Sequence, residues 1–231
     1  MKKQRIVVLS GAGISAESGI QTFRDADGLW EGYDVMSVAS PEGWRKDVSL
    51  VLDFYNQRRR QLLAVEPNIA HRALADLEQK YHVTIITQNI DDLHERAGSS
   101  KVIHLHGELR KSRSTKFENS VYPCDIDINV GDFCAKGAQL RPHIVWFGEA
   151  VPLMEAAAEH VAEADFVIVV GSSMQVYPAA GLVAFAMPSA KIYFIDPRPS
   201  LNYELEKSHN LSIFSEKASI GIPKVVKKLL A

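Results

Sequence analysis

Short, continuously apolar runs recur along the chain and are rich in β-branched residues, as is typical of strands buried on both faces of a parallel sheet. Amphipathic helical patterns lie between several of these runs, at 68–81, 152–164 and 178–187, and another ends the chain at 222–230. Strands that alternate with helices predict βαβ units, and therefore an α/β fold with helices on both faces of a parallel sheet. The predicted strands are 5–10, 82–88, 101–107, 143–148, 165–173 and 191–196.

Two segments interrupt this alternation. Residues 26–67 are helical in pattern and rich in Trp, Tyr and Arg, whereas residues 110–142 are polar and without clear periodicity. We interpret both as insertions that form a smaller lobe beside the sheet. The main domain is then discontinuous, and it comprises residues 1–25, 68–109 and 143–231.

The composition is that of an ordinary globular protein. The chain has 231 residues, of which 46% are hydrophobic and 23% charged, and its net charge is -2. No basic field exists to neutralise phosphates, so nucleic acid is not expected as the main partner. No apolar stretch approaches a membrane span or a signal sequence, and two cysteines do not make a disulfide scaffold. We therefore expect a cytoplasmic protein that does not bind membranes.

A glycine-rich turn follows the first predicted strand. Gly11, Gly13 and Ala16 match G-x-G-x-x-A, the pattern of a dinucleotide-binding turn in a Rossmann-like fold. Glycines there allow a tight turn and the close approach of a pyrophosphate, and backbone N–H groups at a helix start favour an anion. No predicted strand ends in an acidic residue about 20 positions later, where the ribose-binding carboxylate is expected. Asp196, at the end of a later strand, is an alternative that either accepts ribose hydroxyls or simply starts a turn before Pro197.

A tyrosine and three arginines lie within one predicted helix, at residues 53–63. Tyr55 and Arg58 are three positions apart and therefore share a helix face. Taken alone, such a run is most simply a solvated basic face. A phenol beside a guanidinium is also a suitable pair for binding a carboxylate.

Five stretches together resemble the sirtuins, which are NAD-dependent protein-lysine deacylases. The stretches occur in the family's order and extend over most of the chain. The resemblance is greatest to the bacterial branch that is similar to the succinyl- and malonyl-preferring sirtuins (desuccinylases and demalonylases), whose members also resemble deacetylases. The stretches are GAGISAESGIQTFRD (11–25), TQNIDDLHERAG (87–98), HLHGEL (104–109), RPHIVWFGE (141–149) and GSSMQVYPAA (171–180).

The resemblance implies a role for each matching residue. His106 would be the general base, with Asn89 and Asp91 as the other catalytic residues, while His104 is interpreted as structural. The residues implied to bind NAD are Gly11, Ala12, Gly13, Ser15, Phe23, Arg24, Gln88, Asn89, Ile90, Asp91, Gly171, Ser172, Ser173, Asp196 and Ala218.

The acylated lysine would lie at the other end of the site. The resemblance implies that the segments VWFGE and GSSMQV lie on either side of the substrate backbone, which adds to them as a strand. Tyr55 and Arg58 match a Y-x-x-R pair at the acyl pocket, which changes our preferred interpretation of this pair from a solvated face to binding. Arg59 and Arg60 keep the solvated interpretation. The residues implied to bind substrate are Tyr55, Arg58, Ala39, Val145, Phe147, Gly148, Glu149 and Val176.

The implied chemistry fits these residue types. Displacement of nicotinamide creates an oxocarbenium-like centre, which needs a dry pocket and an oriented NAD more than a protein nucleophile. A ribose hydroxyl must then lose a proton, and a histidine with a pKa near 7 suits that task. The expected products are the free lysine, nicotinamide and 2′-O-acyl-ADP-ribose, so NAD is consumed as a co-substrate.

The chain departs from the family in the segment after HGEL. Most sirtuins hold a structural zinc there with two CxxC pairs, whereas this segment has only Cys124 and Cys134. We therefore predict no zinc, and a lobe held by packing of Phe117, Val121, Tyr122, Ile126, Ile128 and Phe133. Two alternatives remain open: a module that senses NAD or ADP-ribose without turnover, and a mono-ADP-ribosyltransferase on the same fold.

Overall fold

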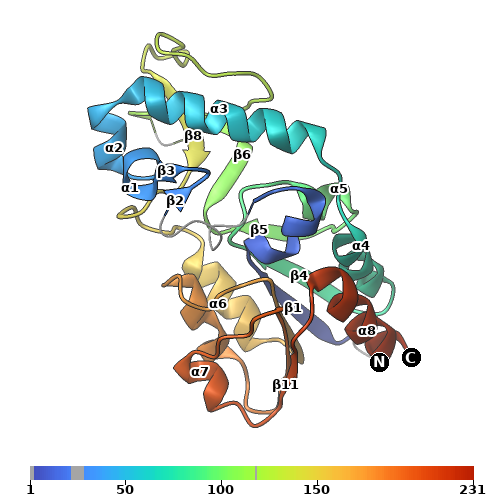
Figure 1. Cartoon of the computed structure of the whole chain (residues 1–231). Coiled ribbons are helices and arrows are strands. Elements are labelled where there is room, and N and C mark those ends of the chain that lie inside the picture. Colours follow the sequence, from blue (N-terminus) through green and yellow to red (C-terminus); the bar gives the residue numbers. More distant parts are fainter. Residues whose placement is uncertain (1–2, 22–28, 118) are drawn as a thin grey trace.

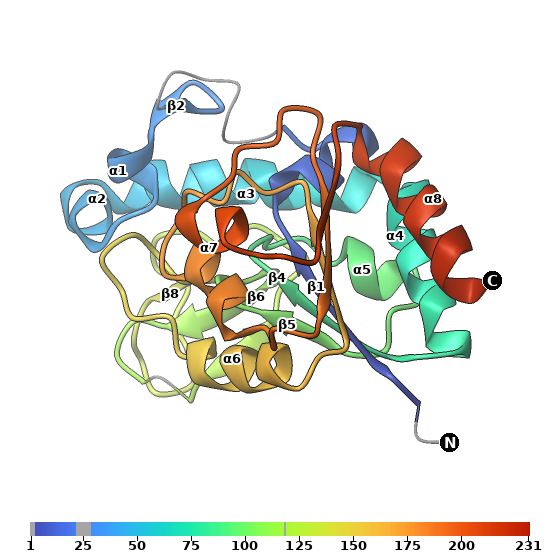
Figure 2. The same cartoon turned by 90° about the horizontal axis from the view of Figure 1, so that it is seen from below.

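The central element is a six-stranded sheet in which all strands run parallel. The computed structural model describes residues 3–21, 29–117 and 119–231. The strand order is β11-β10-β9-β1-β4-β5 (Figures 1 and 2). Such a sheet confirms the predicted α/β, Rossmann-like fold. Its strands are β1 (Arg5–Ser10), β4 (His82–Thr87), β5 (Val102–His104), β9 (Phe166–Val170), β10 (Lys191–Ile195) and β11 (Leu211–Phe214).

Helices cover both faces of this sheet because successive strand residues point to opposite sides. In β1, Ile6 and Val8 pack with the helices α4 (Ile69–Asp76) and α8 (Ala218–Leu230). Val7 and Leu9 pack on the other face with α6 (Met154–Ala162), the 3₁₀ helix η5 (Ala179–Phe185) and α7 (Tyr203–Glu206). Figure 2 shows these two groups of helices on opposite sides of β1. This domain also contains the short helices α5 (Leu93–Arg96) and η4 (Leu77–Gln79).

One predicted strand lies elsewhere. Residues 143–148 were expected in the parallel sheet, but the strand formed here is β8 (Leu140–Ile144), which pairs antiparallel with β6 (Gly107–Ser114). That prediction is wrong, because a short apolar run does not reveal which sheet it joins. The strand β11 was not predicted at all, since its four residues form no continuous apolar run.

The smaller lobe combines helices with two small antiparallel sheets. The long helix α3 (Val48–Ala64) lies over β6 and β8, as Figure 1 shows. It begins at Asp47, whose carboxylate accepts a hydrogen bond from the backbone N–H of Leu50. The other elements are β2 (Leu29–Trp30), β3 (Tyr33–Asp34), α1 (Val35–Val38), α2 (Pro41–Lys46) and β7 (Val121–Pro123). The division of the chain into two domains at the residues given above stays a prediction.

The predicted packing of residues 110–142 is largely wrong. Ile126 is 78% and Phe133 61% exposed, Val121 is exposed, and Phe117 and Tyr122 are only partly buried. Of the six, only Ile128 is buried, in a cluster with Leu52 and Cys124. This segment has too few apolar residues for a core of its own, so Cys124 and Ile128 pack against Leu52 of α3.

A backbone-like pair of hydrogen bonds fastens the same segment. The side-chain amide of Asn56 on α3 donates to the carbonyl of Ile128 at 2.9 Å and accepts from its N–H at 2.9 Å.

The Sγ of Cys124 donates to the Ile126 carbonyl, and that of Cys134 to the hydroxyl of Ser114. Both cysteines are free and buried. The absence of zinc stays a prediction.

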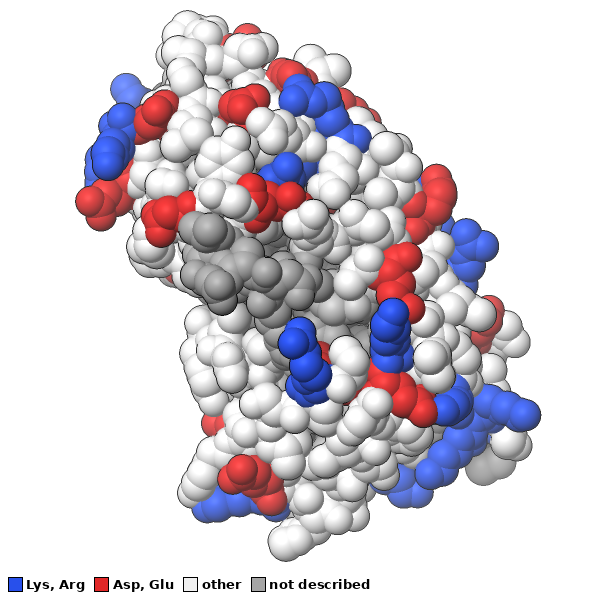
Figure 3. All heavy atoms as spheres, viewed as in Figure 1, with Lys and Arg blue, Asp and Glu red and all other residues white. Residues whose placement is uncertain are grey.

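The surface carries charges of both signs. Figure 3 shows Lys and Arg side chains interspersed with Asp and Glu over one face, without a single sign that covers it. The expectation that nucleic acid is not the main partner stays a prediction. Within the described residues, no helix is long and apolar enough to cross a bilayer.

Candidate active site

A single cleft of about 650 Å³ brings the predicted residues together. Every predicted site residue in the described part of the chain lines it, from Ala39 and Tyr55 in the lobe to Asp196 and Ala218 beside the sheet. Phe23 and Arg24 lie outside the described residues. The roles assigned to these residues stay predictions, but their proximity is an observation.

The cleft lies at the carboxyl edge of the sheet, where the connections after β1 and after β9 lead to opposite edges of the sheet. Ligands of open parallel sheets bind at such a switch point. The two loops there touch each other: Gly11 N–H donates to the Val170 carbonyl at 3.0 Å, and Gly13 N–H to the Gly171 carbonyl at 2.8 Å. A Cβ on Gly13 would lie 2.6 Å from the Gly171 Cα. The glycines therefore allow loop-on-loop packing, in addition to the predicted approach of a pyrophosphate.

The expected α-helix after the glycine turn is absent from the described residues. Two three-residue 3₁₀ helices, Ala12–Ile14 and Ala16–Ser18, stand in its place. The prediction that an anion binds at this turn stays a prediction. The Gly11 and Gly13 N–H groups are occupied as described above, and the Ile14 and Ser15 N–H groups donate to the Gly11 and Ala12 carbonyls.

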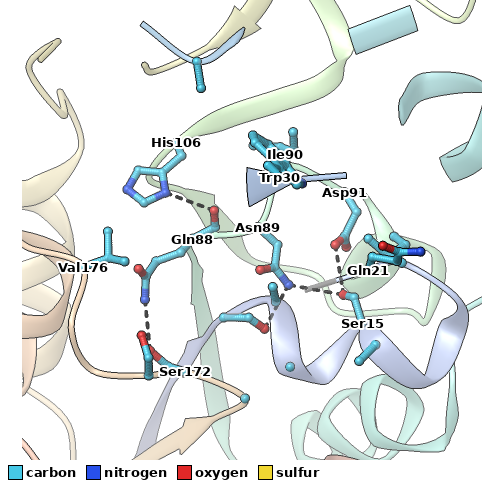
Figure 4. A pocket seen from close by; sticks show the side chains of 18 of the residues that line it. Ser15, Gln21, Trp30, Gln88, Asn89, Ile90, Asp91, His106, Ser172 and Val176 are labelled. Carbon is cyan, nitrogen blue, oxygen red and sulfur yellow. Dashed lines mark hydrogen bonds between the residues drawn. The ribbon is translucent and has the colours of Figure 1, made fainter. Parts of the chain in front are cut away.

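Three predicted side chains form a closed hydrogen-bond network in the centre of the cleft (Figure 4). The Ser15 hydroxyl donates to Asp91 at 2.9 Å and accepts from the Asn89 amide at 3.2 Å. The same amide donates to the Gly11 carbonyl at 3.2 Å. The Ser15 hydroxyl hydrogen is thereby committed to Asp91. The network fixes the end of β4 against the glycine turn.

Asp91 is the buried anion of this network. Burial raises the pKa of its carboxyl to about 6, although hydrogen bonds from the Leu93 N–H and the Ser15 hydroxyl favour the charged form. Its other oxygen accepts from Leu93 N–H at 3.1 Å. A carboxyl group with a pKa of about 6 is mostly ionised at pH 7 and becomes protonated in mild acid. The network therefore loses its negative charge as the pH falls below 6.

His106 presents a free nitrogen to the cleft. Its Nδ1 lies 3.0 Å from the Gln88 carbonyl, and a carbonyl accepts only, so Nδ1 carries the proton (Figure 4). Nε2 is then the unprotonated atom that can accept a proton. Burial lowers the pKa of His106, so the ring is neutral at neutral pH. The predicted strand 101–107 ends at His104, and His106 lies in the turn before β6.

His104 is held as a structural residue, as its interpretation predicted. Its Nε2 lies 2.7 Å from Glu95, and its Nδ1 lies 3.2 Å from the Asn89 carbonyl. Both ring nitrogens therefore have partners, and His104 does not line the cleft. It supports the segment that carries Asn89.

The end of the cleft beside β10 contains Asp196, Arg198, Lys217 and Ala218. Asp196 accepts from the Arg198 N–H at 2.9 Å, as a residue that starts a turn does. Glu17, from the glycine turn, accepts from both the N–H and the hydroxyl of Ser219 at 3.1 and 2.6 Å. This contact joins the start of α8 to the turn after β1, and sequence patterns gave no signal for it.

The VWFG segment crosses the cleft as a loop, although it was expected to end a strand of the main sheet. Its backbone is tied at two points: Val145 N–H donates to the His106 carbonyl, and Phe147 N–H to the Ala39 carbonyl, both at 2.9 Å. Val145, Phe147 and Gly148 line the cleft, and so do Ser173 and Val176. Glu149 lines it too, but its carboxylate is paired with Arg113 and Arg141.

Tyr55 and Arg58 lie at the lobe end of the cleft. The phenol oxygen of Tyr55 accepts from the indole N–H of Trp146 at 3.0 Å. Nε and Nη1 of Arg58 are buried and have no hydrogen-bond partner among the described residues. The Arg58 guanidinium lies 5.0 Å from the centre of the Phe54 ring. An unpaired guanidinium in a largely apolar pocket creates a place for an anion.

The two neighbouring arginines differ from each other. Arg60 is exposed and pairs with Asp127, as predicted for a solvated face. Arg59 is buried, and its guanidinium donates to the Leu109 carbonyl at 3.0 Å and to Asn56 at 2.8 Å. The prediction that Arg59 lies on a solvent-exposed face is therefore wrong. A helix turns by about 100° per residue, so Arg59 points towards β6 while Arg60 points to solvent.

Sequence reasoning missed Trp146. In an extended segment it would point away from Val145 and Phe147, so alternation places it outside the cleft. In the structure it lines the cleft and contacts Tyr55. No local pattern signals this contact, because the two residues are 91 positions apart.

Comparisons with known proteins agree with this geometry. A family model of the Sir2 family matches residues 11–178. A relative from Helicobacter pylori, named NAD-dependent protein deacylase, is 57% identical over 227 residues, which is 98% of each chain. A relative of the same name from Bacteroides thetaiotaomicron is 48% identical and also covers 98% of each chain.

The fold agrees with a solved structure as well. The complex of a Sir2 homologue with NAD has a TM-score of 0.87 and 38% sequence identity, and the match covers 99% of this chain and 90% of that chain. Family, relatives and fold therefore agree with the motifs at residues 11–25, 87–98, 104–109, 141–149 and 171–180. The chain belongs to the Sir2 family.

Proposed function

We propose that this chain, an NAD-dependent protein deacylase of the Sir2 family, prefers protein lysines that carry acidic acyl groups such as succinyl and malonyl. Deacetylation is a weaker activity of the same site. NAD is consumed, with nicotinamide and 2′-O-acyl-ADP-ribose as products. The acyl group would occupy the lobe end of the cleft and the lysine backbone would lie along the VWFG segment.

The observation that carries the acyl preference is the unpaired guanidinium of Arg58. Two of its buried nitrogens lack a partner among the described residues, and leaving charged donors unsatisfied is costly. A carboxylate at the end of the acyl chain would satisfy them with charge-assisted hydrogen bonds. An acetyl group ends in a methyl group and offers no such carboxylate. Ala39, a small residue in the same wall, leaves room for the longer chain.

The centre of the cleft supplies the chemistry. When bound, NAD provides the ribose to which the acyl group is transferred. His106 Nε2 is placed to take a proton from a ribose hydroxyl, because Nδ1 is fixed on the Gln88 carbonyl. Asn89 and Asp91 hold the surrounding loop in place through Ser15. The apolar walls formed by Ile90, Val145 and Phe147 would exclude water from the reacting centre.

The test compares one peptide with either acetyl- or succinyl-lysine, with and without NAD, by mass spectrometry. We expect NAD-dependent removal of succinyl to be faster than removal of acetyl. In the Arg58→Met variant, kcat/KM for the succinyl peptide should fall roughly 10- to 100-fold, since hydrogen bonds to charged groups are worth about 1.5–3 kcal/mol. Deacetylation should change far less.

Arg60→Met is the matched control, because Arg60 lies on the same helix but is exposed. It should leave both rates unchanged. Equal loss of both activities in Arg58→Met would show that Arg58 does not select the acyl group. The assignment as a deacylase would still stand. Release of nicotinamide without loss of acyl, accompanied by ADP-ribosylated protein, would favour the transferase alternative. Binding of NAD without turnover would favour the sensor.

A further inference from the structure

The hydrogen bond between Trp146 and Tyr55 has only one possible direction. An indole Nε1–H is a donor and never an acceptor, so the phenol oxygen of Tyr55 must accept at 3.0 Å. A phenol has one hydrogen of its own to donate. That hydrogen cannot point towards Trp146, where another hydrogen already lies. The contact therefore determines in which direction Tyr55 donates.

The Tyr55 hydrogen has no acceptor among the described residues. No hydrogen bond donated by its hydroxyl is formed there, although the side chain is completely buried. Burial also raises the pKa of Tyr55, so the phenol stays neutral and keeps its hydrogen. Tyr55 lines the cleft together with Arg58. Because Tyr55 lines the cleft, its hydrogen would point towards the cleft when an acyl group there offers an acceptor.

The indole itself is held in place from two sides. The Arg141 guanidinium lies 3.3 Å from the Trp146 ring centre, and Glu149 binds that guanidinium at 2.8 Å. Glu149 also accepts from the Trp146 backbone N–H at 2.8 Å. The ring of Trp44 lies 5.6 Å from that of Trp146. The ion pair near the cleft thus fixes the indole, and the indole fixes the phenol.

We propose that Trp146 is a positioning residue that makes the acyl end of the cleft a surface of donors only. This inference rests on the acidic acyl preference proposed above and extends it. Tyr55 offers O–H, and Arg58 offers Nε–H and Nη1–H. A carboxylate has acceptors only and satisfies all of them, whereas the NH₂ of a terminal amide would face donors. The site therefore rejects a succinamyl group, which has the shape of succinyl but ends in an amide.

The test removes the indole N–H and keeps an aromatic ring. We expect the wild-type enzyme to prefer succinyl- over succinamyl-lysine strongly. In Trp146→Phe the phenol can turn and accept from the amide, so the ratio of the two kcat/KM values should fall about tenfold, the worth of one hydrogen bond. In the Tyr55→Phe background, Trp146→Phe should leave the ratio unchanged. Trp44→Phe is the control for packing and should not alter it.

A second measurement covers the case in which Trp146→Phe does not fold. The indole N–H proton of Trp146, observed by NMR in ¹⁵N-labelled protein, should shift upfield in Tyr55→Phe because it loses its acceptor. An unshifted signal would overturn the inference.

The outcomes separate the two proposals. If the wild type does not prefer succinyl over acetyl, the proposed acyl preference fails. If it does, but Trp146→Phe leaves the succinyl-to-succinamyl ratio unchanged, only the role of Trp146 is wrong. An equal effect of Trp146→Phe with and without the Tyr55 hydroxyl would show that Trp146 does not act through Tyr55.

Discussion

The two ends of the cleft solve different problems with different kinds of contact. At the sheet end, the polar groups of Ser15, Asn89 and Asp91 bind one another, and glycines allow the loops to touch. At the lobe end, apolar walls surround Arg58, whose guanidinium has buried donors without partners among the described residues. The first arrangement is complete without a ligand, whereas the second is completed by one.

This difference assigns reaction and selectivity to separate parts of the molecule. A satisfied network is rigid and keeps His106 and the loops in one geometry, which suits a reaction common to all acyl groups. An unsatisfied charge discriminates, because only a ligand that supplies acceptors relieves its cost. Changes at the sheet end should therefore affect every acyl substrate alike, and changes at the lobe end should alter their ratio. The following predictions test this separation, from the largest effect to the smallest.

His106→Ala should reduce the removal of succinyl and acetyl together, roughly 100- to 10,000-fold, because both need the same proton acceptor. NAD binding measured by calorimetry should persist, since the ring contacts the Gln88 carbonyl and not the glycine loops. His209→Ala, an exposed histidine, is the control. A loss confined to one acyl group would contradict the proposed separation.

Gly13→Ala should weaken the sheet end alone. Its Cβ would lie 2.6 Å from the Gly171 Cα and 2.9 Å from the Gly171 oxygen, so the two loops must move apart. We expect a loss of about 1–3 kcal/mol in the free energy of unfolding and weaker NAD binding. Gly181→Ala, where the nearest atom is 3.6 Å away, should be neutral. The succinyl-to-acetyl ratio should not change in either variant.

Mild acid should destabilise the sheet end through His71. His71 packs on His94 at 4.9 Å between ring centres, and His94 lies 2.9 Å from the Ser10 hydroxyl, just before the glycine turn. Burial lowers the pKa of His71 from 6.5 to about 4. The unfolded chain therefore binds the proton first, so this contribution to stability is complete above pH 6.5 and falls as pH decreases towards 4.

The expected size of this contribution is about 2 kcal/mol lost between roughly pH 7.5 and 5. Denaturant unfolding at both pH values measures it. His71→Leu should reduce the difference by that amount, whereas His209→Leu should not. His94 and Asp91 also titrate abnormally, so the comparison between variants, and not the absolute curve, is decisive. Identical pH dependence in His71→Leu and the wild type would refute the prediction.

Glu17→Gln should have the smallest effect. Ser219 donates to Glu17 from its N–H and hydroxyl, and this contact holds the start of α8 beside the glycine turn. The contact is exposed, so its loss should cost about 0.5–1 kcal/mol and raise KM for NAD about two- to fivefold. kcat and the acyl ratio should remain unchanged. A fall in kcat would mean that Glu17 reaches the reacting centre.

Much of the sheet end was predictable because its signals are local. The runs at 5–10, 82–88, 165–173 and 191–196 correspond to β1, β4, β9 and β10, and their motifs place residues in one cleft. Parallel strands have their carboxyl ends at the same edge, so residues that follow different strands meet there. The family resemblance supplied the assignments to His106 and to the Tyr55–Arg58 pair.

The smaller lobe, which forms this other end of the cleft, was predicted less well because its structure depends on long-range packing. Arg59 and Arg60 are neighbours in the same charge run, yet one is buried against β6 and the other is exposed. Ile126 and Phe133 are apolar but exposed, since this short segment has no second layer to cover them. The strand 140–144 joined the lobe and not the main sheet. No pattern in the neighbouring sequence predicts any of these results.

The sequence by itself therefore determined most strands of the sheet, the glycine turn and the identity of the chemical groups, because periodicity and motif spacing are properties of short segments. Only the tertiary structure decided what those groups touch. Tyr55 and Trp146, 91 positions apart, meet because α3 packs on the strand that precedes Trp146. The direction of one hydrogen bond between them follows from which group donates, and it exists only after the lobe has folded.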